Sequence, residues 1–190
     1  MQMIAGVLSL QQDETSNTAV KTALEQSKSR IHSMALVHEK LYGSVSLKTI
    51  KTKEYTEQLL DFVEQIIGRK DLRIEKTISI DDGLIFDGDT TSNLGLILNE
   101  LVTNSYKHAF TLDKVNTLEV AIQKENDYYL LTYSDNGSGL PENYNFEASE
   151  SLGTQLILIL TDQLNGKMNY SNEGKSTFKI HFKPIEISFS

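Results

Sequence analysis

The segment LGLILNELVTNSYKHAF, residues 94–110, decides the fold, because its apolar residues recur at helical spacing and leave a polar side beside them. The apolar side carries Leu94, Ile97, Leu98, Leu101, Ser105 and Ala109. The polar side carries Asn93, Glu100, Asn104 and Lys107, with His108 on the border. Asparagine is a poor helix former because its amide competes for backbone hydrogen bonds. The polar side is therefore either a solvated face or a ligand site, where oxygens one turn apart could hold hydrated Mg²⁺ and a lysine could meet phosphate.

A glycine-hinged acidic turn, Asp135-Asn136-Gly137-Ser138-Gly139, follows a predicted strand of aromatic and apolar residues at 128–134. Glycines at alternate positions let a ligand approach the backbone closely. A plain hairpin turn is the alternative, since Asn-Gly is a common turn dipeptide. Taken together with the helix at 94–110, the turn predicts an ATP site.

A third polar segment lies at the start of an apolar helix predicted at 153–164. Gly153 and Thr154 open that helix, and the free N–H groups and positive dipole of a helix N-terminus suit phosphate. Residues 142–151, just before it, are acidic, polar and aperiodic. We expect them to form a mobile loop that serves as a lid.

Composition excludes several classes of partner. The 190 residues carry a net charge of -8 without a basic stripe, so we expect no nucleic-acid partner. The chain has no cysteine, which excludes disulfides and thiolate zinc sites and is typical of a reducing compartment. No apolar run reaches the roughly 18 residues of a membrane helix, and residues 1–10 lack the basic start of a signal peptide. We therefore expect a cytoplasmic chain without direct membrane contact.

The amino-terminal segment predicts a helical hairpin. Residues 1–10 resemble the inside of a helix, and residues 11–17 form a polar break with candidate N-caps. Beyond the break, apolar or small residues step by four and three in the manner of a heptad seam, at Val20, Leu24, Ser27, Ile31, Met34, His38 and Leu41. A short hairpin cannot bury such a seam alone, so a homodimer forming a four-helix bundle is the natural inference. Packing of the hairpin on its own chain is the alternative.

The remaining segments predict an α+β domain. Residues 43–53 are a polar connection with a candidate short strand at 45–50, and this connection divides the chain into domains at 1–43 and 44–190. A helix at 54–67 ends at Gly68. Alternating apolar and polar residues predict strands at 72–80, 118–124, 128–134, 166–170 and 177–182. Short joins favour antiparallel pairing, with the helices on one face of the sheet.

Three motifs carry a family resemblance. NELVTNSYKHAF (99–110), DNGSGL (135–140) and SLGTQL (151–156) stand in the order and spacing of the N box and the two glycine boxes of the Bergerat-fold ATPases. That family includes sensor histidine kinases, gyrase-type topoisomerases and Hsp90. Residues 1–11 and 30–42 also look like the dimerisation hairpin of the histidine kinases whose phosphoacceptor box reads H-R-x-K-N. The resemblance implies a Bergerat-type sandwich with a mixed, mostly antiparallel sheet covered by helices on one face.

The resemblance also implies the roles of residues in an ATP site. Asn104 would hold Mg²⁺ against the triphosphate, Lys107 would meet phosphate, and His108 would lie near the base or ribose. Glu100 would orient the nucleophile or accept its proton.

For the base and the phosphates, the resemblance implies roles for six further residues. Asp135 would accept the adenine amino group, and Gly137 and Gly139 would make room for the ring. Thr177 would lie near the adenine, while the phosphates would be received under the lid by Gly153 and Thr154.

The function implied by the resemblance is that of a protein-histidine kinase core, whose phosphohistidine passes its phosphate to an aspartate of a response regulator. In that subfamily the acceptor box comes just before the residues that match Met1, so we expect this chain to bind ATP without phosphorylating itself. Among its own histidines, we expect His32 to be solvated, His38 to lie in the core or interface, and His181 to be structural. The alternative function is a non-catalytic or serine-directed Bergerat module that acts as a nucleotide-gated interaction domain.

Overall fold

A five-stranded sheet forms the base of the molecule in the computed structural model, which describes residues 2–42, 49–67 and 71–184. The strands are β2 (Arg73–Ile80), β4 (Val115–Glu125), β5 (Tyr128–Asp135), β6 (Lys167–Asn172) and β7 (Ser176–Phe182). Their order across the sheet is β2-β4-β5-β7-β6. β2 pairs with β4 in parallel and the other neighbours are antiparallel, which confirms a mixed, mostly antiparallel sheet.

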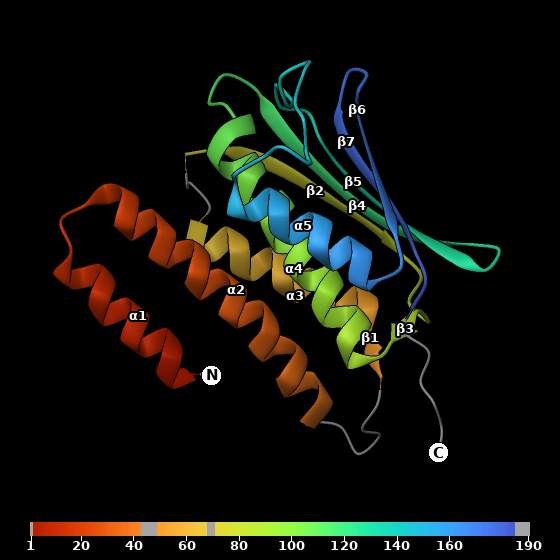
Figure 1. Cartoon of the computed structure of the whole chain (residues 1–190), viewed down its shortest axis with the longest axis horizontal. Helices are drawn as coiled ribbons and strands as arrows, with labels where there is room; N and C mark the ends of the chain where they lie inside the picture. The colour runs from red at the N-terminus through yellow and green to blue at the C-terminus, as the bar shows by residue number, and fades with distance from the viewer. Residues whose placement is uncertain (1, 43–48, 68–70, 185–190) are drawn as a thin grey trace.

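Three helices cover one face of this sheet (Figure 1). They are α3 (Thr52–Ile67), α4 (Gly88–Asn104) and α5 (Leu152–Gln163). A separate two-stranded sheet pairs β1 (Ile50–Lys51) with β3 (Ile85–Phe86), and sequence patterning did not predict β3. The predicted domain boundary, the stop at Gly68 and most of the possible strand at 45–50 lie outside the described residues.

The core lies between the sheet and the helices. Alternate residues of β4 and β5 are buried on the helix side, among them Leu118 and Leu131, each fully buried. They meet the apolar side of α4, where Ile97 is also fully buried. The period of two residues in the strands and of about 3.6 residues in the helices thus identified the core correctly.

The central helix begins earlier and ends differently from the prediction at 94–110. Asp87 caps α4, and its carboxylate accepts hydrogen bonds from the N–H groups of Asp89 and Thr90. After Asn104 the chain continues as a π-helical turn, η1 (Ser105–Ala109), in which the Phe110 N–H donates to the Ser105 carbonyl at 2.9 Å. Such turns insert one extra residue and are frequent at functional sites.

The predicted hairpin is formed by α1 (Gln2–Glu14) and α2 (Thr18–Tyr42), with α2 packed along α4 and α3 on the side away from the sheet (Figure 1). The face of α2 that is buried carries Ser29, Ser33, Leu36 and Val37 rather than the predicted seam. From that seam, Val20 and Met34 are exposed, and the side chains of His38 and Leu41 lie outside the described residues. The helix therefore has one face on its own chain and a second that remains apolar at the surface.

No helix among the described residues combines the length and apolar character needed to cross a membrane.

Tyr55 joins the three helices α2, α3 and α4. It is 1% exposed, its hydroxyl donates to the Ser33 carbonyl of α2 at 3.3 Å, and its ring lies against the backbone of α4 at Gly95. A Cβ at Gly95 would overlap the Tyr55 hydroxyl and lie 2.7 Å from its Cζ. Only glycine leaves room for this contact.

We predict that Gly95→Ala destabilises the fold by about 1–3 kcal/mol, because an added methyl in a packed core forces neighbouring atoms to shift. The loss corresponds to a decrease of several degrees in Tm, measurable by thermal denaturation. Gly6→Ala is the matched helical control, since nothing lies within 4 Å of its Cβ position. An unchanged Tm for Gly95→Ala would contradict the packing described here.

Candidate nucleotide-binding site

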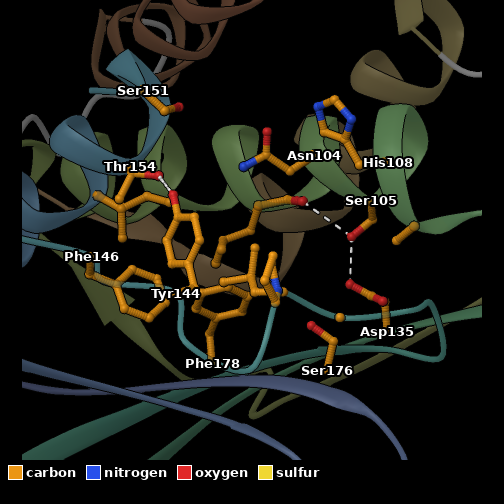
Figure 2. Close-up of a pocket in the computed structure, with 16 residues that line it drawn as sticks. Asn104, Ser105, His108, Asp135, Tyr144, Phe146, Ser151, Thr154, Ser176 and Phe178 are labelled. Carbon is orange, nitrogen blue, oxygen red and sulfur yellow. Dashed lines mark hydrogen bonds between the residues drawn. The ribbon is translucent and has the colours of Figure 1, made fainter. Parts of the chain in front are cut away.

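A cavity of about 350 Å³ lies between α4, α5 and the carboxyl end of β5. Its size falls within the roughly 300–1,000 Å³ typical of small-molecule sites. Polar residues of the wall include Asn104, Ser105, His108, Asp135, Ser151, Thr154 and Ser176. Apolar and aromatic residues of the wall include Leu101, Leu140, Tyr144, Phe146, Ile157 and Phe178. Figure 2 shows Asp135 and Ser176 at one end, Thr154 and Ser151 at the other, and Asn104 and His108 along the side between them.

Asp135 supplies a buried carboxylate at the first end. It is 4% exposed, and it accepts hydrogen bonds from the Ser105 hydroxyl at 2.7 Å and the Gly137 N–H at 2.8 Å. Burial raises the pKa of Asp135 above its ordinary value, while these two hydrogen bonds oppose that shift. The ionised carboxylate can only accept hydrogen bonds, so this end of the cavity suits a ligand that donates one.

Ser105, the first residue of the π-helical turn, reaches this carboxylate from the end of α4. The Ser105 hydroxyl oxygen also lies 2.7 Å from the Tyr133 hydroxyl and 3.3 Å from the Leu101 carbonyl oxygen. Sequence patterning placed Ser105 on the apolar side of the helix and missed this role. The sequence did contain a signal for this role, because Ser105 is a polar residue among the leucines and isoleucine of the apolar side.

The glycine-rich turn is fastened to the sheet by Asn136. Its side-chain oxygen accepts from the Thr117 N–H at 2.9 Å, and its amide donates to the Val115 carbonyl at 2.9 Å. Gly139, with φ of +72°, adopts a backbone conformation that other residues rarely take. A Cβ at Gly137 would overlap the Ala109 side chain, so Gly137 lets the turn close against η1 instead of lining the cavity.

The second end of the cavity is the N-terminus of α5. Thr154 lies 7% exposed in the first turn of this helix, where backbone N–H groups lack helical partners. Its hydroxyl is 2.8 Å from the Tyr144 hydroxyl (Figure 2). The Tyr144 hydroxyl also lies 2.9 Å from the Ser149 hydroxyl. Free N–H groups and a positive dipole make this end suited to an anion.

The segment at 142–151 is anchored by aromatic residues, which the prediction of an acidic lid did not foresee. Tyr144 and Phe146 pack edge to face with centroids 4.9 Å apart. Phe146 then contacts Tyr170 and Phe178, with centroid distances of 5.8 and 6.2 Å. These aromatic contacts hold the segment against the cavity.

Five of the predicted site residues lie in the cavity wall: Asn104, His108, Asp135, Gly139 and Thr154. The other five do not: Glu100, Lys107, Gly137, Gly153 and Thr177. Strand alternation explains the last of these, because Ser176 points to the helix side of β7 and its neighbour Thr177 points away. The serine takes the place expected of the threonine.

Glu100 and Lys107 face the hairpin. Glu100 is 2% exposed and forms a two-point ion pair with Arg30 of α2, at 2.6 and 2.8 Å. The Lys107 ammonium is buried without a hydrogen-bond partner among the described residues, and burial lowers its pKa, an effect that Glu25 and Glu100 oppose. Helical spacing placed both residues beside Asn104, but α2 covers them.

His32 and His181 lie outside the cavity wall. His32, which we expected to be solvated, is half-buried and stacks on Phe62 with centroids 3.2 Å apart, and burial lowers its pKa. His181 in β7 lies 3.4 Å from the Glu125 carboxylate.

Comparison with known proteins gives two family matches. Residues 1–67 match a family described as "Histidine kinase", and residues 89–186 match "Histidine kinase-, DNA gyrase B-, and HSP90-like ATPase". Among solved structures, the histidine kinase domain of Erythrobacter litoralis EL346 superposes with a TM-score of 0.72 at 19% identity, covering 96% of this chain and 95% of that one. Acinetobacter baumannii histidine kinase AdeS gives a TM-score of 0.60 at 18% identity, covering 97% of this chain and 95% of that one. At these identities the likeness shows the fold.

Relatives among characterised proteins are longer. Sensor histidine kinase PdtaS of Mycobacterium tuberculosis is 29% identical over 171 residues, which is 88% of this chain and 33% of PdtaS. Blue-light-activated histidine kinase 2 of Erythrobacter litoralis is 20% identical over 180 residues, which is 92% of this chain and 51% of that protein. The chain thus spans about a third to a half of these relatives. The resemblance to sensor histidine kinases is confirmed, and the match over residues 89–186 shows that the chain belongs to the histidine kinase-, DNA gyrase B- and HSP90-like ATPase family.

Proposed function

We propose that the chain is the ATP-binding catalytic core of a sensor histidine kinase, and that it delivers the γ-phosphate of ATP to a histidine. The observation that carries this proposal is the polarity of one cavity. Asp135 offers a hydrogen-bond acceptor at one end, and the N-terminus of α5 offers an anion site at the other. A nucleotide whose base carries an amino group and whose tail carries phosphates has the matching polarity.

The base end favours adenine by its hydrogen-bonding chemistry. The adenine amino group would donate to Asp135, whose remaining acceptor positions face the cavity beside Ser176. Guanine would present a carbonyl oxygen at the same place, and two acceptors repel each other. Leu140, Ile157 and Phe178 supply apolar walls for the ring.

The phosphate end would be completed by Mg²⁺. Among the described residues no group of three histidine, aspartate or glutamate side chains could hold a metal alone. The donor set instead fits an ion held between the Asn104 amide oxygen, phosphate oxygens and water, as Mg²⁺ prefers. When bound, the ion would neutralise charge that develops on the transferred phosphoryl group. Thr154 and the first N–H groups of α5 would orient the phosphates.

The partners also follow as proposals. The amino-terminal match to a histidine kinase family supports a phosphohistidine that passes its phosphate to an aspartate in a response-regulator receiver domain. A homodimer is supported by the outer face of the hairpin, where Met3, Ile4, Val7 and Leu10 are 50–81% exposed. Contiguous exposed apolar surface of this kind marks an interaction site.

We predict that Asp135→Asn weakens ATP binding by roughly tenfold to a hundredfold, because a hydrogen bond to a charged acceptor contributes about 1.5–3 kcal/mol. The fold should persist, since the variant removes a buried charge. Calorimetric titration measures the affinity and thermal denaturation the stability. Unchanged ATP affinity in a folded variant would contradict the assignment of Asp135 to the base-binding end of the cavity.

Binding by the wild-type chain should also depend on pH. ATP requires the ionised carboxylate, and the pKa of Asp135 is raised in the free protein. ATP affinity should therefore be highest above the raised pKa and fall as the pH decreases through it. This fall should occur at a higher pH than for an ordinary aspartate, whose pKa is near 3.9. A profile that follows an ordinary aspartate would contradict the burial described here.

For the dimer, we predict that Val7→Asp shifts the chain towards monomer in light-scattering measurements of mass, because a charge on the apolar face must be desolvated on association. Asp13→Asn is the control, since it alters an exposed residue of the same helix that is already polar. A wild-type chain that is monomeric at high concentration would contradict the proposed interface.

The phosphoryl-transfer step is tested in the intact natural protein. We expect it to acquire acid-labile, alkali-stable phosphate from ATP, and to pass this label to the aspartate of a receiver domain. Removal of Mg²⁺ with EDTA should abolish labelling, and Asn104→Ala should slow it by at least roughly tenfold if the amide holds the ion. Acid-stable phosphate on serine would instead support the alternative, a serine-directed module.

A further inference from the structure

A buried ion pair joins α2 of the hairpin to α4 of the candidate nucleotide-binding site. Arg30 Nε and Nη2 donate to the two oxygens of Glu100 at 2.6 and 2.8 Å, with side chains 14% and 3% exposed. Next to this pair, the Ser29 hydroxyl donates to the Asn99 side-chain oxygen, and the Asn99 amide donates to Glu100 at 3.4 Å. Both oxygens of Glu100 are thus occupied by a residue 70 positions away in the sequence.

Glu100 lies directly behind the phosphate end of the cavity. A Cβ on Gly153 would be 2.8 Å from Glu100 Oε2, which places the carboxylate against the first turn of α5. One turn along α4 from Glu100, Asn104 enters the cavity wall, as does Thr154 next to Gly153. The carboxylate therefore borders the same helix terminus that would receive the phosphates.

An unpaired carboxylate at this place would oppose phosphate binding in two ways. It would repel a polyphosphate, and it would compete for the positive end of α5. A buried carboxylate is also costly unless a partner compensates its charge. The ammonium group of Lys107 is a second positive charge near Glu100, but among the described residues it donates no hydrogen bond to Glu100. Arg30 is the residue that supplies this compensation.

We infer that Arg30 is a positioning residue for the nucleotide site: from the hairpin, it neutralises and holds Glu100 so that the polyphosphate can bind at the N-terminus of α5. This inference rests on the proposed ATP site and adds a contribution from the hairpin to it. Arg30 itself does not enter the cavity wall. Its effect acts through Glu100 and should scale with the charge of the ligand.

The test compares ATP, ADP and adenosine as ligands of the whole chain by calorimetric titration at fixed ionic strength. Arg30→Gln should weaken ATP binding on the order of tenfold, weaken ADP binding less, and leave adenosine binding unchanged, because only the phosphates meet the uncompensated carboxylate. Lys28→Gln is the matched control. It removes a positive charge from the same helix, but Lys28 bonds Gln12 at 3.2 Å and is not paired with Glu100.

Two further variants separate charge from folding. Arg30→Gln/Glu100→Gln has no carboxylate to compensate and should recover most of the ATP affinity that Arg30→Gln loses. Glu100→Gln alone should bind ATP at least as tightly as the wild type, and it serves as the test if Arg30→Gln does not fold. Equal weakening for all three ligands, a double variant as weak as Arg30→Gln, or weaker ATP binding by Glu100→Gln would overturn the inference. A wild-type chain that binds none of the three ligands would instead overturn the proposed ATP site.

Discussion

The buried carboxylate of Asp135 imposes the constraint on which the site depends. A carboxylate that is almost fully removed from water must be hydrogen-bonded, and here the donors are the Ser105 hydroxyl and the Gly137 N–H. These two hydrogen bonds tie the carboxylate to the first residue of the π-helical turn and to the glycine-rich turn, which closes against Ala109 at Gly137. One acidic side chain at the end of β5 thereby joins the sheet, the central helix and the following loop.

The opposite end of the cavity depends on a different source of charge, the N-terminus of α5. The two ends are complementary to a ligand that donates a hydrogen bond at one end and carries negative charge at the other. Aromatic contacts from Tyr144 and Phe146 hold the intervening segment against this cavity, and the Tyr144 hydroxyl is already bonded to Thr154.

Local patterns in the sequence predicted the elements well and the contacts between them less well. Strands and helices followed from alternation and helical spacing, and the motifs located Asp135, Asn104 and Thr154 in one cavity. The hydrogen bond of Ser105 could not be predicted in this way, because its partner, Asp135, lies 30 positions later in the sequence. For the same reason, the pairing of Glu100 with Arg30 on a distant helix was missed, as was the two-residue strand β3, which is too short to show a period.

The hairpin and the nucleotide-binding half are linked by the side of α2 that packs on α4, while the other side of the hairpin stays apolar at the surface. The central claim, an adenine-specific polyphosphate site, is tested most directly by calorimetric titration of the whole chain with ATP and with GTP in the presence of Mg²⁺. We expect one ATP per chain, bound at least roughly tenfold more tightly than GTP, because a site built around a hydrogen bond rejects a base that cannot form it. Equal affinities for the two nucleotides, or no binding of ATP, would contradict the site described here.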